Sequence, residues 1–250
     1  MDRSERYWRL LASAKNAKAL EAVLKEHSGL PGPRGNLELA HVFARAGQPA
    51  VIWRLARLEP KDAPENTPEG YLAFCGVLGL GRLVIDGDAA AERMLIKRAS
   101  DTRWRVREGV ATGIQLIGDV DRLRFTRMVT TLAGGNALEQ RAAVAAVAEP
   151  RLLKGEAVTV ALRLLDDVTR GLERSNKPLG DAEKVLRQAL GYAWSVVVAA
   201  DPGQGKPAME RWLGSGDPDI GWVMRENLKK KRLQKADPSW CARWGLRRRG

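Results

Sequence analysis

Basic side chains dominate the residues of this sequence that could do chemistry. The segment from Arg225 to Arg249 holds ten Lys and Arg residues and opposes them only with Glu226 and Asp237. Clustered Lys and Arg attract phosphate backbones, because each neutralised phosphate releases condensed counterions. The whole chain has the same bias, with a formal net charge of +12. The segment therefore predicts a surface that binds a polyanion.

Further basic residues near the middle of the sequence favour nucleic acid over a purely local charged end. The alternative for the C-terminal segment is a solvated polar cap on the last helices. Trp222, Trp240 and Trp244 lie among these bases, but their helical spacing favours packing over base stacking. The central bases are Arg93, Lys97, Arg98, Arg103, Arg105, Arg122, Arg124 and Arg127. The candidate nucleic-acid-binding residues are Arg103, Arg105, Arg141, Lys229, Lys230, Lys231, Arg232, Arg247, Arg248 and Arg249.

The usual signatures of catalysis are missing. The sequence has no Gly-x-Ser-x-Gly and no His-Glu-x-x-His motif. The segment 203–206 reads Gly-Gln-Gly-Lys but lacks the upstream glycine of a phosphate loop, and Pro207 stands where that loop has Ser or Thr. The three glycines of 76–81 follow no strand, so they indicate close helix packing. Cys75 and Cys241 alone predict neither a disulfide framework nor a zinc site, so we expect no cofactor and no metal.

Four residues have a spacing that suggests more specific chemistry. Trp104 and Glu108 lie one helical turn apart and therefore share one face of a helix. Arg141 and Tyr192 occupy corresponding places in later segments, so the four side chains could line one groove. The same Trp-x-x-x-Glu spacing recurs within 216–226. A pair that recurs is explained more simply by repeat packing than by a unique site.

Helices must position these residues, because alternating strand patterns are almost absent and apolar residues recur three and four apart. The segments Glu156–Leu172 and Asp181–Ala200 each carry one apolar stripe. Together with the turn signals, these patterns predict roughly twelve to fourteen short helices. Helix start signals stand at Thr67-Pro68, at Asn136 with Glu139, at Asp217-Pro218 and at Asp237-Pro238.

An aspartate that precedes an arginine by six residues recurs along the chain. An aspartate at a helix start satisfies free amides, and an arginine in the second turn can reach the aspartate of a stacked neighbour. The pairs are Asp101 with Arg107, Asp181 with Arg187, and Asp219 with Arg225. Together with Arg141, these arginines lie 34, 46 and 38 residues apart, which is close to the period of helical-pair repeats.

This pattern resembles the Asp/Arg ladder of HEAT repeats, which are armadillo-like helical pairs. The resemblance is good over residues 86–233 and only inferred before residue 86. It implies an all-α fold, an α-α superhelix (solenoid) of about six HEAT-like helical-pair repeats. One domain would span residues 1–250, with a basic tail at 236–250 and a concave surface for a partner.

A narrower resemblance concerns the four residues that could line a groove. Trp104 and Glu108, a Leu-Glu-Gln-Arg-Ala-Ala segment around Arg141 and an Ala-Leu-Gly-Tyr segment ending at Tyr192 resemble the AlkD-like DNA alkylation repair proteins. By that resemblance the two aromatic residues would contact the lesion, the glutamate would stabilise positive charge and the arginine would hold phosphate. The chain lacks the family's tandem Trp-Trp-Asp, with glutamate for its aspartate and tyrosine for its second aromatic.

The favoured prediction is a HEAT-repeat scaffold that binds DNA, or else RNA or an acidic protein, on a basic concave surface. The alternatives are an AlkD-like glycosylase that excises alkylated purines and a protein adaptor with no nucleic-acid role. The longest apolar stretch, Ala193–Ala200, falls short of the ~20 residues that span a bilayer, and the first residues lack a signal-peptide core. We therefore expect a cytoplasmic protein without a membrane partner. The sequence leaves the oligomeric state open, with a monomer favoured.

Overall fold

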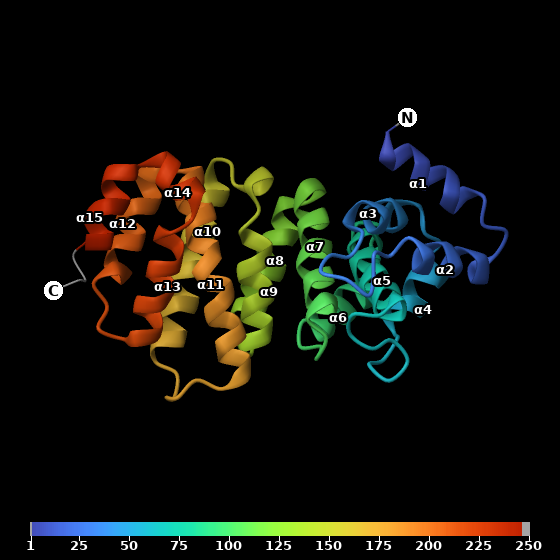
Figure 1. The fold of residues 1–250 in the computed structure, drawn as a ribbon, viewed down its shortest axis with the longest axis horizontal. Coiled ribbons are helices and arrows are strands. Elements are labelled where there is room, and N and C mark those ends of the chain that lie inside the picture. Colours follow the sequence, from blue (N-terminus) through green and yellow to red (C-terminus); the bar gives the residue numbers. More distant parts are fainter. Residues whose placement is uncertain (1, 247–250) are drawn as a thin grey trace. The chain divides into compact units, whose positions relative to one another are not determined.

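The computed structural model describes residues 2–246, with the side chain of residue 246 left undescribed, and this part of the chain contains helices and turns but no strand (Figure 1). The predicted all-α fold class is confirmed. The helices are α1 Arg3–Ala12, α2 Ala17–Glu26, α3 Leu37–Ala46, α4 Pro49–Ala56, α5 Pro68–Ile85, α6 Ala89–Arg98, α7 Trp104–Val120, α8 Arg122–Ala133, α9 Ala137–Val147, η1 Pro150–Leu152 (a 3-10 turn), α10 Glu156–Glu173, α11 Asp181–Ala200, α12 Pro202–Leu213, α13 Pro218–Leu228, α14 Lys231–Ala236 and α15 Pro238–Leu246.

The helices gather into two compact units, Met1–Phe125 and Thr126–Gly250, which we call unit 1 and unit 2. Within each unit, successive helices pack as hairpins around one long helix, in the manner of an α-solenoid. The long helix is α5 in unit 1 and α11 in unit 2. That all 250 residues form one continuous HEAT-like domain stays a prediction.

Helix α5 forms the core of unit 1 because it is apolar around nearly its whole circumference. It packs against α2, α3, α4, α6 and α7. Among the described residues it is the one helix whose length and composition would allow it to cross a membrane, and 78% of it is buried inside the structure.

The glycines of α5 let neighbouring backbones approach closely. A methyl group on Gly76 would lie 2.7 Å from the Cβ of Leu55 in α4, and one on Gly81 would lie 2.8 Å from the Cα of Gly113 in α7. Real Cβ atoms do not approach other atoms so closely, so both sites require glycine. The prediction that these glycines serve close helix packing is confirmed.

A buried asparagine ties α13 to α11 in unit 2. The side chain of Asn227 donates hydrogen bonds to the carbonyl oxygens of Leu190 and Val223, each at 2.8 Å. Its oxygen accepts a 2.7 Å hydrogen bond from the backbone N–H of Ser195. Because all three bonds are fully buried, Asn227 holds the two helices at a fixed distance.

The helix starts predicted from short sequence signals are confirmed. Asn136 and Glu139 form a complete capping box at the start of α9. Thr67 caps α5 and Asp217 caps α13 through their side-chain oxygens. At α15, the backbone N–H of Trp240 donates to a carboxylate oxygen of Asp237 at 2.9 Å. These bonds involve residues two or three apart, which explains why the sequence reveals them.

The three Asp/Arg pairs do not occupy equivalent places in their helices. Asp101 lies outside α7, which begins at Trp104, whereas Asp181 is the first residue of α11 and Asp219 the second residue of α13. Equal spacing in sequence therefore produced three different registers relative to the helix start. The contacts of each pair differ accordingly, as described below.

Candidate nucleic-acid interface

The guanidinium group of Arg103 is buried in hydrogen bonds within unit 1 and is not accessible to a phosphate. Its side chain is 4% exposed. The guanidinium donates to both carboxylate oxygens of Asp101 and to the carbonyl oxygens of Leu58 and Ala63, at 2.8 to 3.0 Å. These bonds pin the loop between α4 and α5 to the start of α7. Arg103 is therefore removed from the candidate nucleic-acid-binding residues.

Arg105 is likewise built into unit 1. It is buried and donates to the carbonyl oxygen of Gly32 at 2.8 Å. Its guanidinium carbon lies 4.4 Å from the ring centre of Trp104, an arrangement typical of a cation–π contact. Sequence alone cannot distinguish such an arginine from one on the surface, because the carbonyl oxygen that it binds belongs to a residue 73 positions away in the chain. Arg105 is also removed from the candidates.

Asp101 is the anion around which these arginines are arranged. It is buried, with Arg98 and Arg103 bonded to its carboxylate, while Arg107 donates to its backbone carbonyl at 2.7 Å. Burial by itself raises the pKa of Asp101, but the hydrogen bonds and charge of Arg103 and the charge of Arg98 outweigh it and hold the pKa below its usual range. Burial lowers the pKa of Arg107.

In unit 2 an arginine does reach the aspartate of the following helical pair. Arg187 of α11 donates a hydrogen bond to Asp219 of α13, and Lys177 pairs with the same carboxylate at 3.0 Å. Burial raises the pKa of Asp219, but the hydrogen bonds from these two cations dominate and lower it. Arg187 also stacks on Trp222, 4.6 Å from its ring centre. Among the described residues, the other members of these two Asp/Arg pairs make no such contact with each other: Asp181 pairs with Lys184, and Arg225 is exposed.

Trp222 is a packing residue in this arrangement. A methyl group on Gly191 of α11 would lie 3.0 Å from the Trp222 ring, so the indole fits against the glycine. The following turn of α13 places Glu226 beside the same glycine, with 3.4 Å to its Cβ. The repeat-packing interpretation of the Trp-x-x-x-Glu spacing within 216–226 is therefore supported for this copy.

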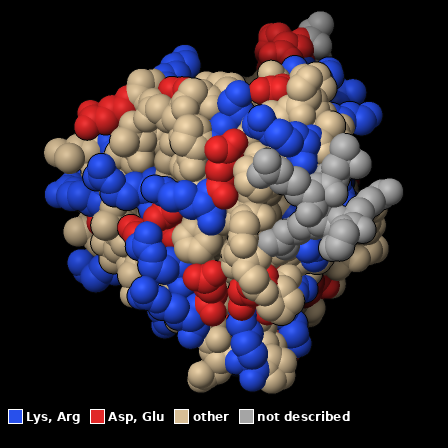
Figure 2. All heavy atoms as spheres, turned by 90° about the vertical axis from the view of Figure 1, so that its left-hand side faces the viewer, with Lys and Arg blue, Asp and Glu red and all other residues tan. Residues whose placement is uncertain are grey.

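A cluster of cations surrounds the turn between α13 and α14, and we call it the α13–α14 basic surface. It consists of Arg225, Lys229, Lys230, Lys231, Arg232 and Lys235. The single carboxylate among them is Glu226, which is bonded to Lys229 at 2.5 Å. That hydrogen bond, aided by the charges of Lys229, Lys230 and Arg225, lowers the pKa of Glu226 against the opposing effect of burial. Figure 2 shows how Lys and Arg side chains spread over this end of unit 2, with fewer Asp and Glu between them.

An exposed tyrosine stands beside this surface. Tyr192 of α11 is 45% exposed. Arg232 of α14 lies over its ring, 4.5 Å from the centre, and donates a 2.6 Å hydrogen bond to its hydroxyl. An aromatic side chain beside cations is the combination that binds nucleic-acid strands, by stacking and by charge. Arg247, Arg248 and Arg249, also predicted to bind nucleic acid, lie outside the described residues.

Trp104 and Glu108 line a second, separate feature in unit 1, a pocket of about 230 Å³. Tyr71 and Phe74 of α5 form part of its lining, and Arg34 lies at its edge. The sequence did not indicate these two α5 residues, because they are distant in the chain and embedded in an apolar run. The indole of Trp104 is 45% exposed although Arg105 covers one of its faces.

Of the four residues predicted to line one groove, the structure therefore joins Trp104 with Glu108 in unit 1. Arg141 is half-buried in α9, and Tyr192 lies in α11, both in unit 2. Within residues 2–246, whose placement the structure describes, no three His, Cys, Asp or Glu residues form a group that could hold a metal ion.

The helical hairpins within each unit define an all-α protein of the α-solenoid class. No family model and no curated protein matches the sequence. Among solved structures, the chain is similar to two engineered proteins solved by the Northeast Structural Genomics Consortium. One has 15% identity and a TM-score of 0.36, with 94% of this chain and 98% of that chain covered. The other has 14% identity and a TM-score of 0.37, with 95% and 100% covered.

A designed armadillo repeat protein is also similar, with 16% identity and a TM-score of 0.38. The likeness covers 91% of this chain and 98% of the designed one. All three neighbours are engineered or designed proteins.

Proposed function

We propose that this protein is a helical-repeat scaffold that binds a polyanion, with DNA as the first candidate, through the α13–α14 basic surface of unit 2. The observation that carries the proposal is the excess of solvent-accessible cations there, six Lys and Arg around one paired glutamate. The interface differs from the one expected from sequence, because Arg103 and Arg105 are committed to unit 1 itself.

The distribution of charge supports this placement. Unit 2 holds 22 of the 42 Lys and Arg residues but only 14 of the 30 Asp and Glu residues. Lys230, Lys231 and Lys235 take part in no ion pair among the described residues, so their ammonium groups are available to phosphate oxygens. Contacts of this kind bind any sequence, and shape or groove width would then decide between sites.

Removing the three lysines at 230, 231 and 235 by changing each to glutamine is expected to weaken binding to a duplex of random sequence. For each phosphate that the variant no longer neutralises, the slope of log affinity against log salt should also decrease in magnitude by about 0.9. Fluorescence anisotropy of a labelled duplex between low and moderate salt measures both quantities.

The matched control carries the same loss of charge in unit 1, with glutamine at the exposed lysines 18, 61 and 97. It should retain most of the affinity and the salt slope. Equal losses in both variants would mean that only net charge matters. Absence of duplex binding at low salt would contradict the proposal and leave a protein adaptor as the better interpretation.

A second candidate function rests on the unit 1 pocket that holds Trp104 and Glu108. An exposed indole one helical turn from a carboxylate could stack on an alkylated base and stabilise the positive charge that develops as the base leaves. The resemblance to AlkD-like proteins implies these two roles for Trp104 and Glu108, and it also assigned roles to Arg141 and Tyr192, which are not part of this pocket. The pocket supplies both groups from one helix, α7, without help from unit 2.

Incubation with methylated DNA tests this second candidate. If it holds, free modified base is released, and release drops at least about tenfold in Glu108→Gln and in Trp104→Ala. Glu26→Gln is the control, because that exposed glutamate lies in unit 1 outside the lining of this pocket. Release that persists undiminished in the first two variants, or no release at all, would exclude this pocket as the site.

A further inference from the structure

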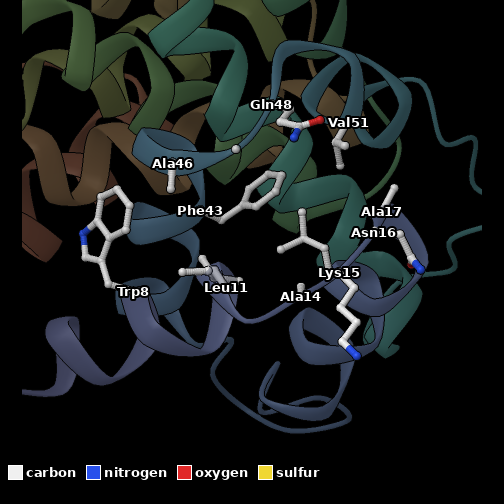
Figure 3. Close-up of a pocket in the computed structure, with 13 residues that line it drawn as sticks. Trp8, Leu11, Ala14, Lys15, Asn16, Ala17, Phe43, Ala46, Gln48 and Val51 are labelled. Atoms are coloured by element: carbon white, nitrogen blue, oxygen red, sulfur yellow. The ribbon is translucent and has the colours of Figure 1, made fainter.

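Unit 1 contains another pocket, between its first two helical hairpins, that the proposed function does not use. It has a volume of about 380 Å³ and is bounded by α1, the turn into α2, the end of α3 and the start of α4 (Figure 3). Pockets of 300 to 1,000 Å³ are typical of sites for small molecules. Its size therefore fits a small ligand.

Most residues that line this pocket have apolar side chains, although polar atoms supply about half of its exposed surface. Phe43 and Val51 come from the α3–α4 hairpin, and Trp8, Leu11 and Leu20 come from the first two helices. Figure 3 shows the indole of Trp8 at one side, with Leu11 and the Phe43 ring beside the open space. Trp8 is 45% exposed, so part of its ring remains accessible to a ligand. A ligand with an apolar body would bury this ring.

The only formal charge on the residues that line this pocket is positive. Lys15 is the one charged residue of the lining, no Asp or Glu contributes to it, and Lys15 has no ion pair among the described residues. In Figure 3 its ammonium points away from the apolar residues, and because Lys15 is exposed, a change of rotamer can turn it toward a ligand. Asn16 and Gln48 also line the pocket, at the starts of α2 and α4. The amino-terminal ends of these two helices add positive potential.

We propose that this pocket binds a small amphiphilic carboxylate, with its hydrocarbon part against Trp8, Leu11 and Phe43 and its carboxylate toward Lys15. A single lysine cannot hold a polyanion, and the absence of acidic residues from the lining disfavours a cation. The volume of about 380 Å³ suits a hydrocarbon part that is a short chain or a single ring system. The site is independent of the α13–α14 basic surface, which lies in the other unit.

Isothermal titration of the full chain with octanoate, and with 1-octanol as the uncharged analogue, tests the proposal. We expect octanoate to bind at one site and more tightly than octanol. Lys15→Gln should weaken octanoate about threefold to fivefold, as expected for one exposed ion pair, and leave octanol unchanged. Lys18→Gln is the control, because that lysine lies on α2 outside the lining.

Two further variants test the location. Trp8→Ala should weaken both ligands more than tenfold, because it removes a wall of the pocket. Ala46→Leu should do the same by filling the space, with thermal unfolding measured to show that the variant folds. Equal affinity for octanoate and octanol, or an unchanged affinity in Lys15→Gln, would overturn the assignment of an anionic ligand. Unchanged binding in folded Trp8→Ala and Ala46→Leu would overturn the assignment of the pocket.

Discussion

Gly81→Ala is expected to destabilise unit 1 by about 3 kcal/mol, although alanine normally favours a helix over glycine by about 1 kcal/mol. The added methyl group would lie 2.8 Å from the Cα of Gly113, and the backbones of α5 and α7 would have to separate. Since α5 is the core of the unit, separation there disturbs packing along its length. Urea unfolding measures the loss as a lower midpoint.

Gly171→Ala supplies the matched control for this prediction. Gly171 also lies within a helix, α10, but a methyl group there meets no atom within 4 Å. Only the helix preference remains, so this variant should be more stable by about 0.5 to 1 kcal/mol. The interpretation of Gly81 as a site of helix contact would be wrong if both substitutions changed stability in the same direction.

Asp101→Asn is expected to cost about 3 kcal/mol or more, because it leaves the buried guanidinium group of Arg103 without its counter-charge and Arg98 with Glu59 alone. Removing one partner of a buried ion pair is costlier than removing the whole pair. Asp62→Asn, at an exposed carboxylate near the same loop, should be nearly neutral. Denaturant unfolding of both variants measures the difference, and comparable small effects would contradict the role assigned to Asp101.

The same carboxylate makes the stability of unit 1 depend on pH. The pKa of Asp101 is lower in the folded chain than in the unfolded chain, where it is about 3.9. Its contribution to the free energy of unfolding is therefore fully present above pH about 4 and is lost as the pH falls through the folded pKa. Between pH 5 and 2 the wild-type protein should lose more stability than Asp101→Asn. Parallel curves would show that Asp101 does not carry this dependence.

Short-range features of this fold could be predicted from the sequence. The boundaries expected for α10 and α11 agree with the structure to within one residue, and the caps at Thr67, Asn136 and Asp217 are present. Each depends on residues within one or two helical turns, so the information is local. The described residues form fifteen α-helices, slightly more than expected, because short helices such as α14 carry too few residues for a clear apolar stripe.

The use of each charged side chain could not be predicted in this way. Arg103 and Lys230 are both basic residues in basic stretches, but one is buried against Asp101 and the other lies in the turn between α13 and α14. The difference depends on whether carbonyl or carboxylate oxygens from a distant part of the chain lie within reach. For Arg103 those oxygens belong to residues 58 and 63, some forty positions away.

Local patterns along the chain were enough to establish the all-α class, the positions of most helices, their caps and the need for glycine where helices meet, because helix periodicity and capping act over a few residues. Packing between distant segments determined which arginines are buried in hydrogen bonds and why equal Asp/Arg spacings led to unequal contacts. It also determined where the pockets that contain Trp8 and Trp104 lie. A guanidinium or an indole takes its role from the partners that packing brings to it, and those partners are distant in the chain.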